Sequence, residues 1–176
     1  MSATTDRTAT GRSQAGRSQA FLSLGSNVEP ERHLRAAIAA LRERFGDVVV
    51  SPVYRVPAVG FEGPDFLNAA AIVDTDLDPF ALVEWLHDLE RANGRVRGPV
   101  KFNDRTLDID LVYFDDIVLD ERGLRLPRDE LRHAFVLRPL ADIAPAFVDP
   151  VRNASLADLW RAHPDFGKAL DVVEVL

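Results

Sequence analysis

Apolar residues recur at helical spacing in two segments of the chain. They stand three or four positions apart over residues 30–45 and again over residues 79–93, as expected for a helix with one buried face. Each segment starts with a proline, which is favoured at the first helical position, and is followed by a glycine, which is favoured just after the last turn. Asp78 precedes the second segment and is a typical N-cap residue. The pattern therefore predicts two amphipathic helices.

Runs rich in β-branched and aromatic residues predict strands around these helices. The strands are expected at 21–24, running into a Gly-Ser-Asn turn at 25–27, then at 48–54, 66–75 and 106–114. Pro52 interrupts the second strand, which suits an edge or a bulge, and residues 57–64 hold two Pro and two Gly, which indicates a loop. A turn at Asp115-Asp116 is expected to join the last strand to a short partner at 117–119. Short helices are predicted near 129–140 and after a cap at Ser155.

The order strand, helix, strand, strand, helix, strand favours a ferredoxin-like α+β sandwich, with helices packed on one face of a mostly antiparallel sheet. A doubly wound α/β fold is the weaker alternative, because the second and third strands meet without a helix between them. One domain is expected over residues 21–176. Residues 1–20 contain Ser, Thr, Ala, Gly and Arg without an apolar cluster, so we expect a disordered tail.

Composition narrows the functional classes. With 47% hydrophobic residues in 176, the chain is expected to bury the core of one globular domain. A formal net charge of −7 disfavours nucleic acid as a partner unless a local basic patch exists. The absence of cysteine excludes disulfides and thiolate metal sites, and the sequence has no apolar run near the length of a membrane span. We therefore expect a cytoplasmic protein with neither nucleic acid nor membrane as a partner.

Two acids in the predicted strand 106–114 are candidate metal ligands. Asp108 and Asp110 are two positions apart, so both carboxylates leave one face of the strand, while Val112 and Phe114 are expected to continue that face as apolar residues. Two close carboxylates repel each other unless a cation lies between them, and hard oxygen ligands suit magnesium bound together with phosphates. A solvated polar face is the alternative.

Four cations precede this strand within eleven residues: Arg95, Arg97, Lys101 and Arg105. Guanidinium groups present planar donors to phosphate oxygens, so the cluster suits a polyphosphate beside a carboxylate-bound metal. Other features carry less information. The Gly-Ser-Asn segment favours a plain turn over an anion site, and the aromatic residues Phe66, Phe102 and Phe135 favour core by spacing alone, although with Asn68 they could frame a flat heterocycle. The four histidines form no metal-ligand pair.

These residues stand in motifs that resemble the 6-hydroxymethyl-7,8-dihydropterin pyrophosphokinase family of the folate pathway. The resemblance covers about residues 21–150, through FLSLGSN, YRVPAVGFEGPDFLNAA, GRVR, RTLDIDLVYF and AFVLRPLADIAP. It implies a ferredoxin-like fold that transfers a pyrophosphoryl group from ATP to the hydroxymethyl oxygen of a dihydropterin and releases AMP. These two small molecules are then the expected partners.

The resemblance also implies roles for individual residues. Asp108 and Asp110 are expected to hold two magnesium ions. The implied catalytic contacts come from Arg95, Arg97 and Arg105. Contacts with ATP are implied for His87, Arg97, Lys101, Arg105 and Leu111. Contacts with the pterin are implied for Val56, Pro57, Val59, Phe66, Asn68, Phe102 and Phe135.

Several positions differ from the pattern of the family, all of them on the nucleotide side. Residues 101–105 read Lys-Phe-Asn-Asp-Arg in place of the usual Arg-Trp-Gly-Pro-Arg, Pro127-Arg128 replaces a Pro-His step, and His87 replaces a glutamine. Two alternatives therefore accompany the pyrophosphokinase. One is a paralogue that acts on another pterin, and the other is a catalytically silent module that binds a nucleotide or pterin.

Overall fold

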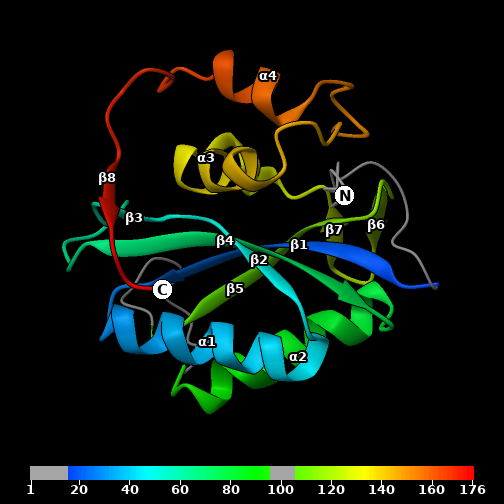
Figure 1. Cartoon of the computed structure of the whole chain (residues 1–176), viewed down its shortest axis with the longest axis horizontal. Helices are drawn as coiled ribbons and strands as arrows, with labels where there is room; N and C mark the ends of the chain where they lie inside the picture. The colour runs from blue at the N-terminus through cyan, green and yellow to red at the C-terminus, as the bar shows by residue number, and fades with distance from the viewer. Residues whose placement is uncertain (1–15, 96–105) are drawn as a thin grey trace, which may run out of the picture.

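The computed structural model describes residues 16–95 and 106–176, which form an antiparallel sheet covered by helices on both faces (Figure 1). The main path of the sheet has the order β5-β1-β4-β3-β8, and β2 also pairs with β4. The strands are β1 (Ser18–Ser26), β2 (Val48–Val50), β3 (Val53–Val56), β4 (Phe66–Thr75), β5 (Asp108–Phe114) and β8 (Asp171–Val173), with β6 (Leu119–Glu121) and β7 (Leu124–Leu126) as a separate pair. The helices are α1 (Pro30–Phe45), α2 (Pro79–Ala92), α3 (Ala134–Ile143) and α4 (Leu156–Arg161), with a 3₁₀ turn, η1 (Asp129–Arg132).

The two long helices begin and end where the sequence predicts. Pro30 opens α1, and the main-chain N–H of Gly46 closes it by donating to the carbonyl of Arg42. In α2, the carboxylate of Asp78 accepts a hydrogen bond from the amide of Ala81, as an N-cap does. Ser155 caps α4 in the same way through the amide of Asp158. Local sequence therefore determines these boundaries.

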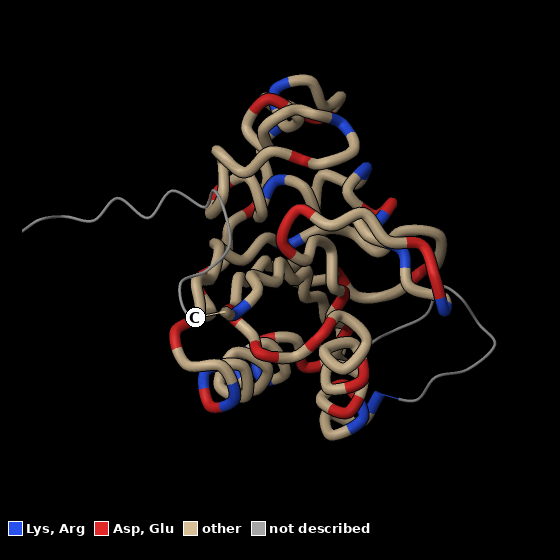
Figure 2. The backbone as a smooth tube through the Cα atoms, turned by 90° about the vertical axis from the view of Figure 1, so that its right-hand side faces the viewer, with Lys and Arg blue, Asp and Glu red and all other residues tan. Residues whose placement is uncertain are grey.

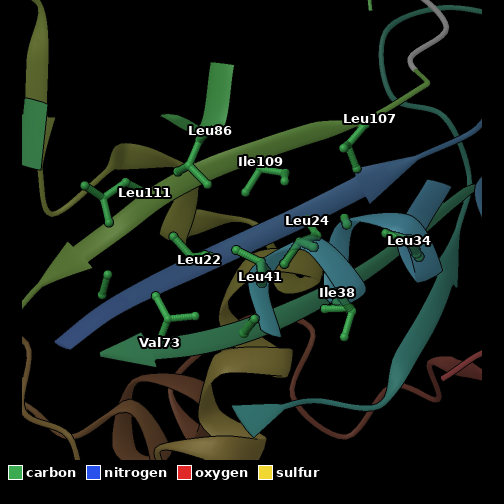
Figure 3. Close-up of a cluster of buried hydrophobic side chains, with 14 of the residues drawn as sticks. Leu22, Leu24, Leu34, Ile38, Leu41, Val73, Leu86, Leu107, Ile109 and Leu111 are labelled. Atoms are coloured by element: carbon green, nitrogen blue, oxygen red, sulfur yellow. The ribbon is translucent and has the colours of Figure 1, made fainter. Parts of the chain in front are cut away.

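Helices cover both faces of the sheet, so the expectation of helices on one face is wrong. Helices α1 and α2 lie on one side, and α3 with α4 on the other (Figure 1). Each side has its own apolar core. The first, under α1 and α2, is built from side chains such as Leu24, Ile38 and Leu86 (Figure 3). The second, under α3, centres on Phe21, Tyr113 and Leu140.

Several predicted boundaries differ from the structure, including the strand expected at 48–54, which is divided into β2 and β3. Strand β1 begins at Ser18 rather than at Phe21, and Ala20 is fully buried, so the predicted tail is too long by three residues. The strand after Asp115-Asp116 is β6, which pairs with β7 and not with β5. The helix predicted over 129–140 is divided into η1 and α3 by His133, whose backbone is extended.

The described surface mixes both signs of charge. Figure 2 shows acidic and basic positions interspersed over the helices and loops, as on an ordinary solvated surface. Within residues 16–95 and 106–176, no helix combines the length and the apolar character that crossing a membrane requires.

Candidate active site

Three residues from separate parts of the chain lie in one row across the sheet. Gly25 of β1 is paired with Asp108 of β5 on one side and with Asn68 of β4 on the other. Residues paired across neighbouring strands share a face of the sheet, so the carboxylate and the carboxamide flank the glycine on the side of α3. Their Cα atoms are two strand separations apart, roughly 10 Å. The topology thus places an acid and an amide on either side of one glycine.

Gly25 leaves room for the carboxamide of Asn68. A Cβ atom at this position would lie 2.8 Å from Oδ1 of Asn68, closer than real Cβ contacts allow. The expected Gly-Ser-Asn turn is wrong here, because Gly25 and Ser26 belong to β1 and continue its pairing. The glycine therefore provides space between strands rather than a turn.

Asn68 is a buried polar residue with an unsatisfied donor. The residue is 5% exposed, and Nδ2 has no hydrogen-bond partner among the described residues. A buried amide without a partner costs about 1–3 kcal/mol, so Nδ2 is a donor that an acceptor atom of a ligand would satisfy. Phe66 lies on the same face of β4, two residues before Asn68.

Phe135, at the start of α3, belongs to the margin of the second core. The ring of His133 stacks on it at a centroid distance of 4.9 Å and an interplanar angle of 10°. Burial, together with the nearby Arg132, lowers the pKa of His133, so the neutral imidazole is favoured against this ring.

Asp108 and Asp110 leave the same face of β5, as the sequence predicts. Ile109 between them packs into the first core. The face then changes, because Val112 is an extra residue in the pairing with β1, which forms a β-bulge. Phe114 consequently packs into the first core, so the expectation that it shares the face of the two acids is wrong.

Each acid has an arginine beside it. Nη1 of Arg95 lies 2.5 Å from Oδ1 of Asp108. Nη2 of Arg128 lies 3.7 Å from Oδ1 of Asp110. Arg128 also donates two hydrogen bonds of 3.1 Å to the carboxylate of Glu130, from Nε and Nη2. Burial lowers the pKa of both guanidinium groups, but the carboxylates more than offset this, so both pKa values are raised.

Arg128 compensates Asp110 only in part. Burial and repulsion from Asp108 raise the pKa of Asp110 to about 7, although Arg128 acts to lower it. The side chains of Asp108 and Asp110 remain 26% and 30% exposed, so neither is sealed by its arginine. Two adjacent, accessible carboxylates with excess negative charge form an oxygen donor set that fits a hard divalent cation. Among the described residues, no cluster of three or more acidic or histidine side chains offers a fuller protein cage.

The structure brings some of the predicted site residues to this face and leaves others elsewhere. Val56 ends β3 and is paired with Phe66, while Pro57 and Val59 lie exposed in the following loop. The side chain of Leu111 is buried in the first core, on the opposite face from the acids, which leaves its main chain to meet a ligand. His87 lies partly buried on α2. Arg97, Lys101, Phe102 and Arg105 lie outside the described residues.

Sequence reasoning assigned no site role to Gly25, Glu90, Arg128 or Glu130. The role of Gly25 depends on its pairing with β4 and β5. The sequence alone suggests only local structures for a Gly-Ser-Asn segment, such as a turn. Glu90 is an acid at a helical position that is buried, with 2% of its side chain exposed, and a buried acid signals a specific partner. The sequence shows Arg128 as a departure from the Pro-His step of the family, but it does not indicate that this arginine binds Asp110 and Glu130.

Comparison with known proteins decides among the classes that this geometry allows. Residues 21–145 match the protein family described as 7,8-dihydro-6-hydroxymethylpterin-pyrophosphokinase (HPPK). The chain belongs to the HPPK family. The match includes both aspartates, Asn68 and Gly25, so the row across the sheet lies within the part of the chain that defines the family.

Bacterial relatives agree with this assignment. The 2-amino-4-hydroxy-6-hydroxymethyldihydropteridine pyrophosphokinase of Pseudomonas aeruginosa is 40% identical over 131 residues, which cover 71% of this chain and 80% of the relative. The protein of the same name from Methylorubrum extorquens is 40% identical over 144 residues, covering 77% and 90%. The predicted folate-pathway pyrophosphokinase is confirmed over the paralogue and the silent binding module.

Solved structures confirm the fold. Wild-type HPPK-DHPS of Plasmodium falciparum superposes with a TM-score of 0.65 at 16% sequence identity. The superposition covers 83% of this chain but 41% of the parasite protein, so this chain spans less than half of that structure. At this identity the likeness supports the predicted ferredoxin-like α+β fold and no detail of the site.

Proposed function

We propose that this chain transfers the β,γ-pyrophosphoryl group of ATP to the hydroxymethyl oxygen of 6-hydroxymethyl-7,8-dihydropterin. In this reaction the acceptor oxygen forms a bond to the β-phosphorus, the bond from that phosphorus to the α,β-bridging oxygen breaks, and AMP leaves. The hydroxyl proton of the acceptor passes to solvent water. The observation that supports the proposal most directly is the row across the sheet, which holds the carboxylate of Asp108 and the unsatisfied amide of Asn68 on either side of Gly25.

Asn68 and its neighbours are suited to a flat heterocycle with polar edges. The carboxamide offers a donor at Nδ2 and an acceptor at Oδ1, which is the pair that a pterin edge complements. Phe66 and Phe135 supply aromatic surfaces on the same side of the sheet. The chain thus orients the acceptor so that its hydroxymethyl group points along the row toward Asp108.

Asp108 and Asp110 are the proposed ligands of two magnesium ions. When bound, magnesium neutralises phosphate charge and holds the reacting oxygens in line. Arg95, fixed beside Asp108, is placed to donate hydrogen bonds to the phosphates. Arg97 and Arg105 are proposed as further phosphate contacts from the resemblance alone.

A direct test incubates the purified chain with ATP, magnesium and 6-hydroxymethyl-7,8-dihydropterin and separates the nucleotide products. We expect AMP in a one-to-one ratio with pyrophosphorylated pterin, and no AMP when EDTA is present. Production of ADP instead would overturn pyrophosphoryl transfer. Tight binding of both substrates without turnover would favour a binding module.

The metal role is tested by Asp110→Ala. Because Asp110 is one of the two proposed magnesium ligands, its removal should abolish turnover, and the loss of repulsion from Asp108 should leave the unfolding temperature unchanged or higher. Asp116→Ala is the matched control, since Asp116 is an exposed acid just beyond β5. Near-normal rates in Asp110→Ala, with normal rates in the control, would refute the assigned role.

A further inference from the structure

Glu90, in the last turn of α2, is the most deeply buried carboxylate beside the candidate site. Its side chain is 2% exposed, whereas the other glutamate of α2, Glu84, is exposed. Burying a carboxylate is unfavourable unless hydrogen bonds and opposite charge replace water. The groups that bind the carboxylate of Glu90 therefore indicate the role of this buried charge.

One carboxylate oxygen of Glu90 binds the main chain of β5. The amide of Ile109 donates to Oε1 over 3.0 Å. Strand β5 ends the main path of the sheet and pairs on one side with β1, so the amide of Ile109 points outward and receives its partner from α2. Because Ile109 stands between Asp108 and Asp110, this bond fixes the stretch of backbone that carries both acids.

The other oxygen binds the arginine beside Asp108. Oε2 of Glu90 lies 3.1 Å from Nη1 of Arg95, and the same nitrogen lies 2.5 Å from Oδ1 of Asp108. The main-chain amide of Arg95 also donates to the carbonyl of Glu90 over 3.1 Å. Glu90 thus holds Arg95 at its backbone and at its guanidinium, and the arginine cannot leave Asp108 without breaking the contact with Glu90.

We infer that Glu90 is a positioning residue for the transfer reaction: its carboxylate clamps the backbone at Ile109 and the guanidinium of Arg95 in one fixed arrangement beside Asp108. Glu90 does not touch substrate. It sets the distance between a phosphate-binding cation and the strand that carries the two acids. The inference rests on the proposed function.

Two substitutions in α2 separate the contacts of Glu90 from a general effect of removing a negative charge from the helix. Glu90→Gln keeps an oxygen for the amide of Ile109 but removes the charge that holds Arg95. Displacing a catalytic group by about 1 Å can slow a reaction by roughly 100-fold. We therefore expect kcat to fall by about 10–100-fold, while the dissociation constants of ATP and pterin, from calorimetry, change by less than about threefold. Glu84→Gln, on the exposed side of α2, should leave both unchanged.

A double-mutant cycle decides whether Glu90 acts through Arg95. In an Arg95→Ala background, Glu90→Gln should change kcat by less than about twofold, because the group that it positions is gone. Equal effects of Glu90→Gln in both backgrounds, or a loss of kcat that only matches a loss of folded protein, would overturn the inference.

If Glu90→Gln does not fold, Arg95→Lys replaces it: the clamp predicts the same drop in kcat, and a wild-type kcat would contradict it. Failure of the unmodified chain to form AMP refutes the proposed function instead, so the two failures are distinguishable.

Discussion

At the scale of single residues, the site depends on an absent side chain as much as on the charged ones. Gly25 lies between Asp108 and Asn68, and a methyl group there would meet Oδ1 of Asn68 at 2.8 Å. Since Asn68 is buried, its carboxamide has little space into which it can rotate. The glycine therefore determines the position that the carboxamide of Asn68 can take.

We expect Gly25→Ala to weaken pterin binding by about ten-fold or more, because the displaced amide no longer pairs with the ring edge. Binding of ATP should be nearly unchanged. Calorimetry with each substrate measures the two effects, and circular dichroism verifies the fold. Asn68→Ala supplies the control: adding Gly25→Ala to it should have little further effect. A Gly25→Ala protein with wild-type pterin affinity would show that Asn68 accommodates a methyl group at position 25.

At the scale of elements, the segment between α3 and α4 is fastened to β5 by one buried acid. Asp149 is fully buried and accepts hydrogen bonds from the hydroxyl of Tyr113 at 2.5 Å, from the amides of Val151 and Arg152, and from the guanidinium of Arg152. Burial raises the pKa of Asp149, but these bonds outweigh it and hold the pKa below its usual value. The ionised form therefore stabilises the native state.

This linkage predicts how stability depends on pH. A carboxyl whose native pKa is depressed contributes stability above its unfolded pKa of about 3.9, and the contribution disappears as pH falls through the native pKa. Asp149→Asn should lower the free energy of unfolding by roughly 2–4 kcal/mol at pH 7. The difference from wild type should shrink below about pH 4. Urea denaturation between pH 3 and 7, with the exposed Asp116→Asn as control, tests this. A difference independent of pH would contradict the assignment.

The elements also show which features sequence could predict. Periodicity and caps predicted α1, α2 and β4 correctly, because Pro30, Asp78 and the apolar stripes act locally. The alternation of side chains along a strand also predicted correctly that Asp108 and Asp110 share one face of β5. The bulge at Val112 and the close approach of Asn68 to Gly25 could not be predicted, since both arise from pairing between strands distant in the chain. The position of β6 was missed for the same reason: its partner, β7, lies beyond the expected hairpin.

At the scale of the whole molecule, the family match and the folded unit differ in extent. The match ends at residue 145, yet both cores continue beyond it. Phe147, Leu156 and Trp160 complete the second core under α3, and Val175 packs into the first. The C-terminal strand β8 extends the sheet by pairing with β3. The last thirty or so residues therefore belong to the structural unit that holds the site in place.

Removal of residues 171–176 tests this extent. Val175 is 8% exposed, and its carbonyl accepts a hydrogen bond of 2.9 Å from Nε of Arg35 on α1. Burial of one valine contributes about 1.5–3 kcal/mol, so with the lost hydrogen bonds we expect the free energy of unfolding to fall by roughly 2–4 kcal/mol.

The truncation also exposes the outer edge of β3, and an exposed edge invites pairing between molecules. We therefore expect concentration-dependent association in analytical ultracentrifugation. Deletion of Leu176 alone is the control, because this residue is 53% exposed. Its loss should leave the free energy of unfolding and the association state unchanged. Because β8 lies at the far end of the sheet from β5, kcat per folded molecule should stay near wild type. A truncated chain as stable as the control would show that the fold is already complete before Asp171.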